Sequence, residues 1–227
     1  MSRASEHLLL AFCIGVSVFG VLLMISWTNN PPTIIDDFSW RKPLIGSLFS
    51  LICILGILAS IFPSRCSEAF HFGEATKDTA TRQILNASHH PDCERFSAHV
   101  VRINGQTRCA ACTGLLLGAV IAIVGACLYF SSGLHIGNAH FLPLAGGIGV
   151  LAGFLQWRFK AYVRLALNSV FVFGAFLSLV GVDQASQNVA IDLFSVMLIV
   201  FWIFTRIQLS QWDHSRTCDS CNSPCGS

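Results

Sequence analysis

Six long apolar stretches are the feature that most constrains what this chain of 227 residues can fold into. An apolar helix of about 20 residues crosses a hydrocarbon core of about 30 Å. A window of that length finds such segments at Leu8 to Trp27, Pro43 to Phe62, Thr113 to Phe130, Phe141 to Trp157, Leu165 to Val182 and Val189 to Phe204. The sequence therefore predicts an all-α, polytopic membrane protein with about six transmembrane helices.

The composition favours a lipid bilayer as the main partner. Hydrophobic residues make up 53% of the chain and charged residues only 11%, less than half of the share of roughly 25% that is usual in soluble domains. The net charge is +2 and no run of Lys or Arg forms a basic patch, which argues against a nucleic-acid partner.

The apolar segments divide the chain into four parts. Residues 1–62 carry two transmembrane helices, residues 63–112 form a loop module rich in Cys and His, residues 113–207 carry four transmembrane helices, and residues 208–227 form a Cys-rich tail. No small-x-small cleavage site precedes the stretch TNNPP, so we expect the first segment to be a retained anchor.

The basic residues predict an orientation in the cell membrane. If the N-terminus is cytoplasmic, 12 of the 14 Lys and Arg residues lie inside and only Arg41 and Lys42 lie outside, which follows the positive-inside rule. We therefore expect both termini, the loop module and the tail to be cytoplasmic. Thiols are kept reduced there, so a Cys-x-x-Cys pair is more often a metal-ligand pair or a redox centre than a disulfide.

The loop module has a spacing that is typical of a zinc site. His90-x2-Cys93 is followed, after fifteen residues, by Cys109-x2-Cys112. Two such pairs can close the tetrahedron that zinc takes with nitrogen and sulfur ligands. Asn104-Gly105 is a turn signal, so a short hairpin between HVVRI and QTR would bring the two pairs together.

Two other interpretations of Cys109 and Cys112 stay open. The pair directly precedes an apolar helix, whose positive N-terminal end favours a reactive thiolate, so a redox dithiol is one alternative. The other is that these cysteines and histidines are ordinary loop residues with no ligand. Covalent c-type haem attachment is excluded, because Thr113 and not His follows Cys112.

The tail has a similar group of thiols, Cys218-x2-Cys221-x3-Cys225, with His214 nearby. These residues can bind a second zinc, share a site with the loop, or ligate an iron–sulfur cluster if a fourth ligand is supplied, for which Cys66 is a candidate. A tail rich in Ser and Gly is equally typical of a segment that binds no metal.

The apolar segments show packing signals and no sign of ion transport. None has an ionisable residue in its central part, which disfavours an ion-driven transporter, since Asp183 and Asp192 lie near segment ends. Small residues recur at four-residue spacing, in the pairs Gly114 with Gly118 and Gly149 with Gly153. This spacing favours close helix packing within one subunit, and the alternative is a dimer interface or a ligand groove. No P-loop, nucleophile elbow or zincin motif identifies an enzyme.

Two segments resemble the DUF2085 family of predicted archaeal and bacterial membrane proteins. The first is similar to a family pattern that ends in Cys-Ala-Arg-Cys-Thr-Gly at the start of a membrane helix; it contains His89-His90, Arg95, Phe96, Cys109, Cys112, Thr113, Gly114 and Gly118. The second lies within GVLAGFLQWRFKAYVR and resembles the family's second signature through Gly153, Gln156 and Arg164.

The chain departs from the family pattern at three positions. His89 stands where the family tends to have Cys, Ala111 where it has Arg, and Ala152 where it has Asp. A His in place of Cys still provides a metal ligand, whereas Ala152 removes any role of the acid. The site that the resemblance implies is made by His89 or His90 with Cys109 and Cys112, and with Cys93 as fourth ligand or bystander. The resemblance implies no reaction.

Together these features predict an integral membrane protein whose cytosolic Cys/His module binds zinc in a structural role. Such a protein can act as a homo-oligomer, or as a subunit or accessory factor of a larger membrane complex. The alternative is a membrane oxidoreductase that uses the Cys109/Cys112 dithiol or an iron–sulfur centre. The sequence names neither a substrate nor a reaction.

Overall fold

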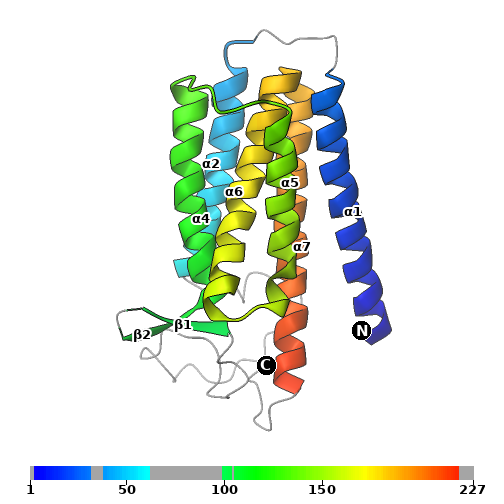
Figure 1. Ribbon diagram of the computed structural model, residues 1–227, viewed down its shortest axis with the longest axis vertical. Coiled ribbons are helices and arrows are strands. Elements are labelled where there is room, and N and C mark those ends of the chain that lie inside the picture. The colour runs from blue at the N-terminus through cyan, green and yellow to red at the C-terminus, as the bar shows by residue number, and fades with distance from the viewer. Residues whose placement is uncertain (1–2, 32–37, 62–98, 104, 220–227) are drawn as a thin grey trace, which may run out of the picture.

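The helices form an elongated bundle with a small hairpin at one end (Figure 1). A computed structural model describes residues 3–31, 38–61, 99–103 and 105–219, and the remaining residues lie outside these ranges. The long elements are α1 (Arg3–Asn29), α2 (Arg41–Ile61), α4 (Ala110–Ala126), α5 (Phe141–Phe154), α6 (Ala161–Ser186) and α7 (Val189–Asp219). A π-helical turn, η2 (Cys127–Ser131), extends α4, and a 3-10 turn, η3 (Leu155–Arg158), extends α5.

Within the described ranges, five helices are long and apolar enough to cross a membrane: Ser5–Asn29, Arg41–Ile61, Ala110–Ser131, Ala161–Ser186 and Val189–Thr217. The predicted fourth segment is also helical, but α5 has 14 residues and is only about 21 Å long at 1.5 Å per residue. Large apolar side chains cover the outside of the bundle, for example Phe12 and Ile148, which are 64% and 62% exposed. The fold is therefore that of a helical, multi-pass membrane protein.

The two ends of the bundle collect different elements. The start of α1, the hairpin, the start of α4, the start of α6 and the end of α7 lie together, and we call this the hairpin end (Figure 1). The start of α2, η2, the end of α6 and the start of α7 lie at the opposite end. Each end holds one buried group of polar side chains.

Glycines of α4 and α5 let both helices pack closely on α6. A Cβ atom added to Gly114 would lie 2.2 Å from the carbonyl oxygen of Leu165, and one added to Gly118 would lie 2.8 Å from that of Ser169. On α5, a Cβ at Gly153 would lie 2.5 Å from the Cβ of Phe171. The predicted small-residue faces are thus covered by α6 of the same chain, and the packing interpretation is confirmed.

The hairpin predicted around Asn104-Gly105 is present. β1 (Val100–Ile103) pairs antiparallel with β2 (Gln106–Cys109), with Val100 opposite Cys109. Gly105 has a φ of +78°, a left-handed conformation that side chains disfavour. Val101 is buried, and the Tyr162 hydroxyl of α6 donates to the Arg102 carbonyl oxygen at 3.3 Å, so the hairpin rests on the start of α6.

The last helix is longer than the sequence predicts. The sixth apolar segment ends at Phe204, whereas α7 continues through the first part of the expected tail to Asp219. Leu209 is buried, and Trp212 packs edge-on against Trp157 of η3, with ring centroids 5.7 Å apart. Hydropathy falls after Phe204 because polar residues enter the helix, but these contacts hold it on the bundle.

Candidate functional site

Two cysteines lie where the hairpin joins the start of α4. β2 ends at Cys109, which has extended backbone angles (φ −65°, ψ 122°) and precedes the first helical residue, Ala110. Cys112 follows within the first turn, and the Thr113 hydroxyl donates to the Cys109 carbonyl oxygen at 2.9 Å. Both thiol-bearing residues are therefore fixed at a helix start, where the N–H groups of the first turn create a positive potential.

Cys109 and Cys112 line a cavity of about 100 Å³, which we call the cysteine pocket. Its walls come from the hairpin, α4, α6 and α7, and its lining residues are His99, Cys109, Ala111, Cys112, Arg164, Arg206, Ser210 and His214. The pocket thus collects two thiols, two imidazoles and two guanidinium groups from segments that are far apart in the sequence. The two thiols can supply two ligands of a metal ion, and a nearby guanidinium can stabilise a thiolate.

Arg206 gives the cysteine pocket a buried positive charge. Its side chain donates from Nε and Nη2 to the Asn168 Oδ1 atom, at 2.9 and 2.6 Å. Arg206 is 7% exposed and Asn168 is fully buried. Arg206 has no carboxylate partner in the part of the chain that the structure describes. Arg206 lines the same pocket as Cys109 and Cys112, so its positive charge favours the ionised form of either thiol.

A second arginine of the pocket is neutralised by an acid. Arg164 Nη2 donates to Asp213 Oδ2 at 2.7 Å, and Arg164 Nη1 lies 3.4 Å from His99 Nε2. The same Asp213 oxygen is 3.9 Å from His99 Nε2. This buried group ties α6 and α7 to the start of the hairpin.

The structure describes only part of the predicted metal site. It brings Cys109 and Cys112 together, as their spacing predicts. Cys218 lies in the last turn of α7, but its side chain is outside the description; His89, His90, Cys93, Cys221, Cys225 and Cys66 lie entirely outside the described residues. Among the described residues, no three His, Cys, Asp or Glu side chains are grouped closely enough to hold a metal ion.

Sequence reasoning missed the residues that surround the two thiols. His99 and Arg206 were not expected to face them, and His214 was expected to serve the tail. Asn168 within an apolar segment was the available signal, because a polar residue in a transmembrane helix usually faces a partner inside the bundle.

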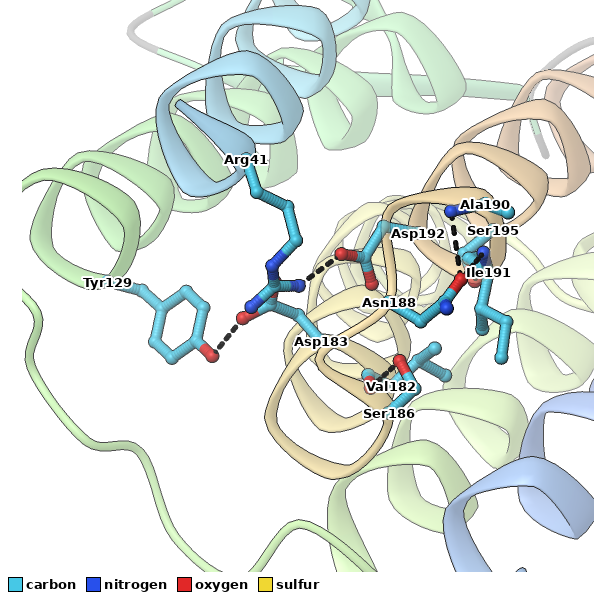
Figure 2. A network of polar contacts seen from close by, with 10 residues as sticks. All are labelled: Arg41, Tyr129, Val182, Asp183, Ser186, Asn188, Ala190, Ile191, Asp192 and Ser195. Carbon is cyan, nitrogen blue, oxygen red and sulfur yellow. Dashed lines mark hydrogen bonds and ion pairs between the residues drawn. The ribbon is translucent and has the colours of Figure 1, made fainter. Parts of the chain in front are cut away.

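A second buried polar group, the carboxylate cluster, lies at the opposite end of the bundle and consists of Arg41, Tyr129, Asp183 and Asp192 (Figure 2). Arg41 Nη1 donates to Asp183 Oδ1 at 2.6 Å and also to Asp192 Oδ2. The Tyr129 hydroxyl donates to Asp183 Oδ2 at 2.5 Å. These contacts join α2, η2, α6 and α7 at one point.

The start of α7 holds Asp192 in place within this cluster. The Asn188 Oδ1 atom accepts from the backbone N–H groups of Ala190 and Ile191, at 3.0 and 3.3 Å, and so caps the helix (Figure 2). Asp192 lies in the first turn, where a negative side chain is favoured by the helix dipole.

Comparison with models of known protein families, with curated proteins and with solved structures found no match to this chain. The resemblance to DUF2085 therefore stays a prediction that rests on the residues quoted for it.

Proposed function

We propose that this chain is a six-span protein of the cell membrane that binds a zinc ion through Cys109 and Cys112. The zinc has a structural role, since it fastens the preceding loop to the start of α4. Both termini and the zinc site face the cytoplasm, as the distribution of basic residues indicates. The fourth of the six spans consists of α5 together with η3, and the two elements cover Phe141 to Arg158.

The cysteine pocket is the observation that carries this proposal. Two thiols at Cys-x-x-Cys spacing enter one small cavity together with His99 and His214. Sulfur and imidazole nitrogen are the ligands that zinc prefers in structural sites. The positive charge of Arg206, which lines the same pocket, offsets part of the negative charge of two zinc-bound thiolates.

Two further ligands complete the tetrahedron. The sequence spacing assigns them to His89, His90 or Cys93, since His99 and His214 line the pocket without forming a ligand group with the two thiols among the described residues. Zinc analysis of His89→Ala, His90→Ala and Cys93→Ser identifies them, because loss of a ligand lowers the zinc content.

A redox dithiol is the second candidate function. The observation that favours it is the same buried Arg206, which stabilises a thiolate at Cys112 or Cys109 without any metal. A disulfide trapped between Cys109 and Cys112, or between one of them and a partner protein, would support this candidate. An iron–sulfur centre would instead give the purified protein visible colour.

Metal analysis of the full-length protein purified in detergent tests the proposal. We expect stoichiometric zinc in the wild type and its loss when Cys109 and Cys112 are both replaced by Ser. Cys127→Ser is the matched control, because Cys127 is exposed in η2 and far from the pocket, and it should keep its zinc. Unchanged zinc in the double variant, or a zinc-free wild type, would refute a zinc site at these thiols.

A further inference from the structure

The carboxylate cluster carries an unbalanced charge. Asp183 and Asp192 are both fully buried, and Arg41 is the cation that contacts them among the described residues. Two buried carboxylates and one guanidinium sum to a charge of −1. Because an uncompensated buried charge is very costly, the cluster needs one more positive charge.

The neighbouring titratable groups do not supply this charge. Lys42 of α2 lies over the Tyr129 ring, 5.0 Å from its centroid, and is not among the ion-pair partners of either acid. His135, in the connection between α4 and α5, is exposed. Tyr129 carries no positive charge, and its hydroxyl donates a hydrogen bond to Asp183 Oδ2. Asp36 and Asp37 lie outside the described residues and would add only negative charge.

The geometry brings the two acids close to one another. Both accept a hydrogen bond from the same atom, Arg41 Nη1, so their two accepting oxygens lie on either side of one nitrogen. Both oxygens of Asp183 have partners, whereas Asp192 Oδ1 is buried and has none among the described residues. A carboxyl pair at this separation cannot be ionised twice without strong repulsion, and sharing a proton removes that repulsion.

A metal ion fits the cluster less well than a proton. Arg41 Nη1 lies between the acids and donates to both. Asp192 Oδ1 is then the one carboxylate oxygen of the pair without a hydrogen-bond partner among the described residues. Hard cations need several oxygen ligands, and among the described residues no three His, Cys, Asp or Glu side chains gather for one.

We propose that Asp183 and Asp192 form a proton-binding site in which the two carboxyl groups share one proton. A cavity of about 320 Å³ adjoins the cluster and gives the proton a route to Asp183, which lines it with Arg41 and Tyr129. Exposed residues, among them Phe38 and His135, form other parts of its wall, so the cavity reaches the surface. Loss of the proton sets two carboxylates against each other where α6 meets α7, and so weakens the contact between these helices.

Infrared spectroscopy of the full-length protein in lipid nanodiscs tests this site. At neutral pH we expect a carboxylic acid C=O band that shifts in D₂O and on incorporation of ¹³C-labelled aspartate. The band should disappear in Asp192→Asn and in Asp183→Asn, because the remaining acid then balances Arg41 without a proton. It should grow in Arg41→Gln, in which both acids lose their cation.

Controls separate the site from other acids and other cations. Asp213→Asn, which alters an acid at the hairpin end, should keep the band. Absence of the band in wild-type protein at neutral pH would overturn the proposal, whether or not the variants fold. Persistence of the band in both Asn variants would also overturn it. Loss of the band when Na⁺ replaces choline at constant pH would overturn it as well, because Na⁺ would then supply the positive charge in place of the proton.

Discussion

Gly114 is the position at which a single methyl group should disturb the bundle most. A Cβ atom there would lie 2.2 Å from the carbonyl oxygen of Leu165 and 2.8 Å from the Cβ of Asn168, whereas ordinary contact begins at 3.4 Å. In Gly114→Ala, α4 must therefore move away from α6 by about 1.2 Å, the difference between 3.4 and 2.2 Å. Neither contact is a flexible side-chain end that can turn aside.

The expected cost follows from two opposing terms. Overpacking typically costs 1–3 kcal/mol, and we take about 3 kcal/mol because the obstacle is backbone. Replacing a helical Gly by Ala returns about 1 kcal/mol. The net loss of about 2 kcal/mol corresponds to a fall in melting temperature of roughly 4–8 °C for a chain of this size.

Gly56→Ala is the matched control, since a Cβ at this position of α2 meets nothing within 4 Å. Thermal unfolding followed by circular dichroism in one detergent should show a lower melting temperature for Gly114→Ala and an equal or higher one for Gly56→Ala. Because Gly114 follows Cys112 by two residues, the first variant should also retain less zinc. If Gly114→Ala melts at the wild-type temperature or above, α4 and α6 are not packed as described.

Two further predictions concern the buried charges and the orientation. Arg41→Met should cost roughly 3–5 kcal/mol of stability at neutral pH, because the negative charge that remains on the buried carboxyl pair loses its cation. Acid should restore part of this stability by protonating the pair, and a loss that does not depend on pH in thermal unfolding would contradict this reasoning. Reporter fusions at either terminus should be active only in the cytoplasm, and activity of either fusion outside would reverse the orientation.

The sequence predicted the features that depend on local patterns. Apolar runs located every helix of the bundle, and Asn104-Gly105 located the hairpin, since a glycine at a turn allows the positive φ that Gly105 adopts. The spacing of Gly114 and Gly118 predicted close packing, because residues four apart share a helix face. Each of these signals spans only a few residues.

The polar groups were beyond such reasoning because their members are distant in sequence. Arg41 is 142 residues from Asp183 and 151 from Asp192, so only the arrangement of the helices brings them together. The same holds for Arg206 and Cys109, which line one pocket because α7 continues past the predicted end of its apolar segment. Hydropathy locates a helix, but it does not tell which helices are neighbours.

The glycine contacts along α6 have a consequence for the alignment of the helices. Residues of α6, among them Phe171 and Ser169, lie directly over glycines of α5 and α4, so α6 cannot slide along these helices without driving side chains or backbone into the neighbouring turns. Polar contacts strengthen this alignment at both ends, through Asp183 at one end and through Arg164 and Asn168 at the other. A shift of α6 along its axis would therefore break the glycine contacts and both polar groups at once.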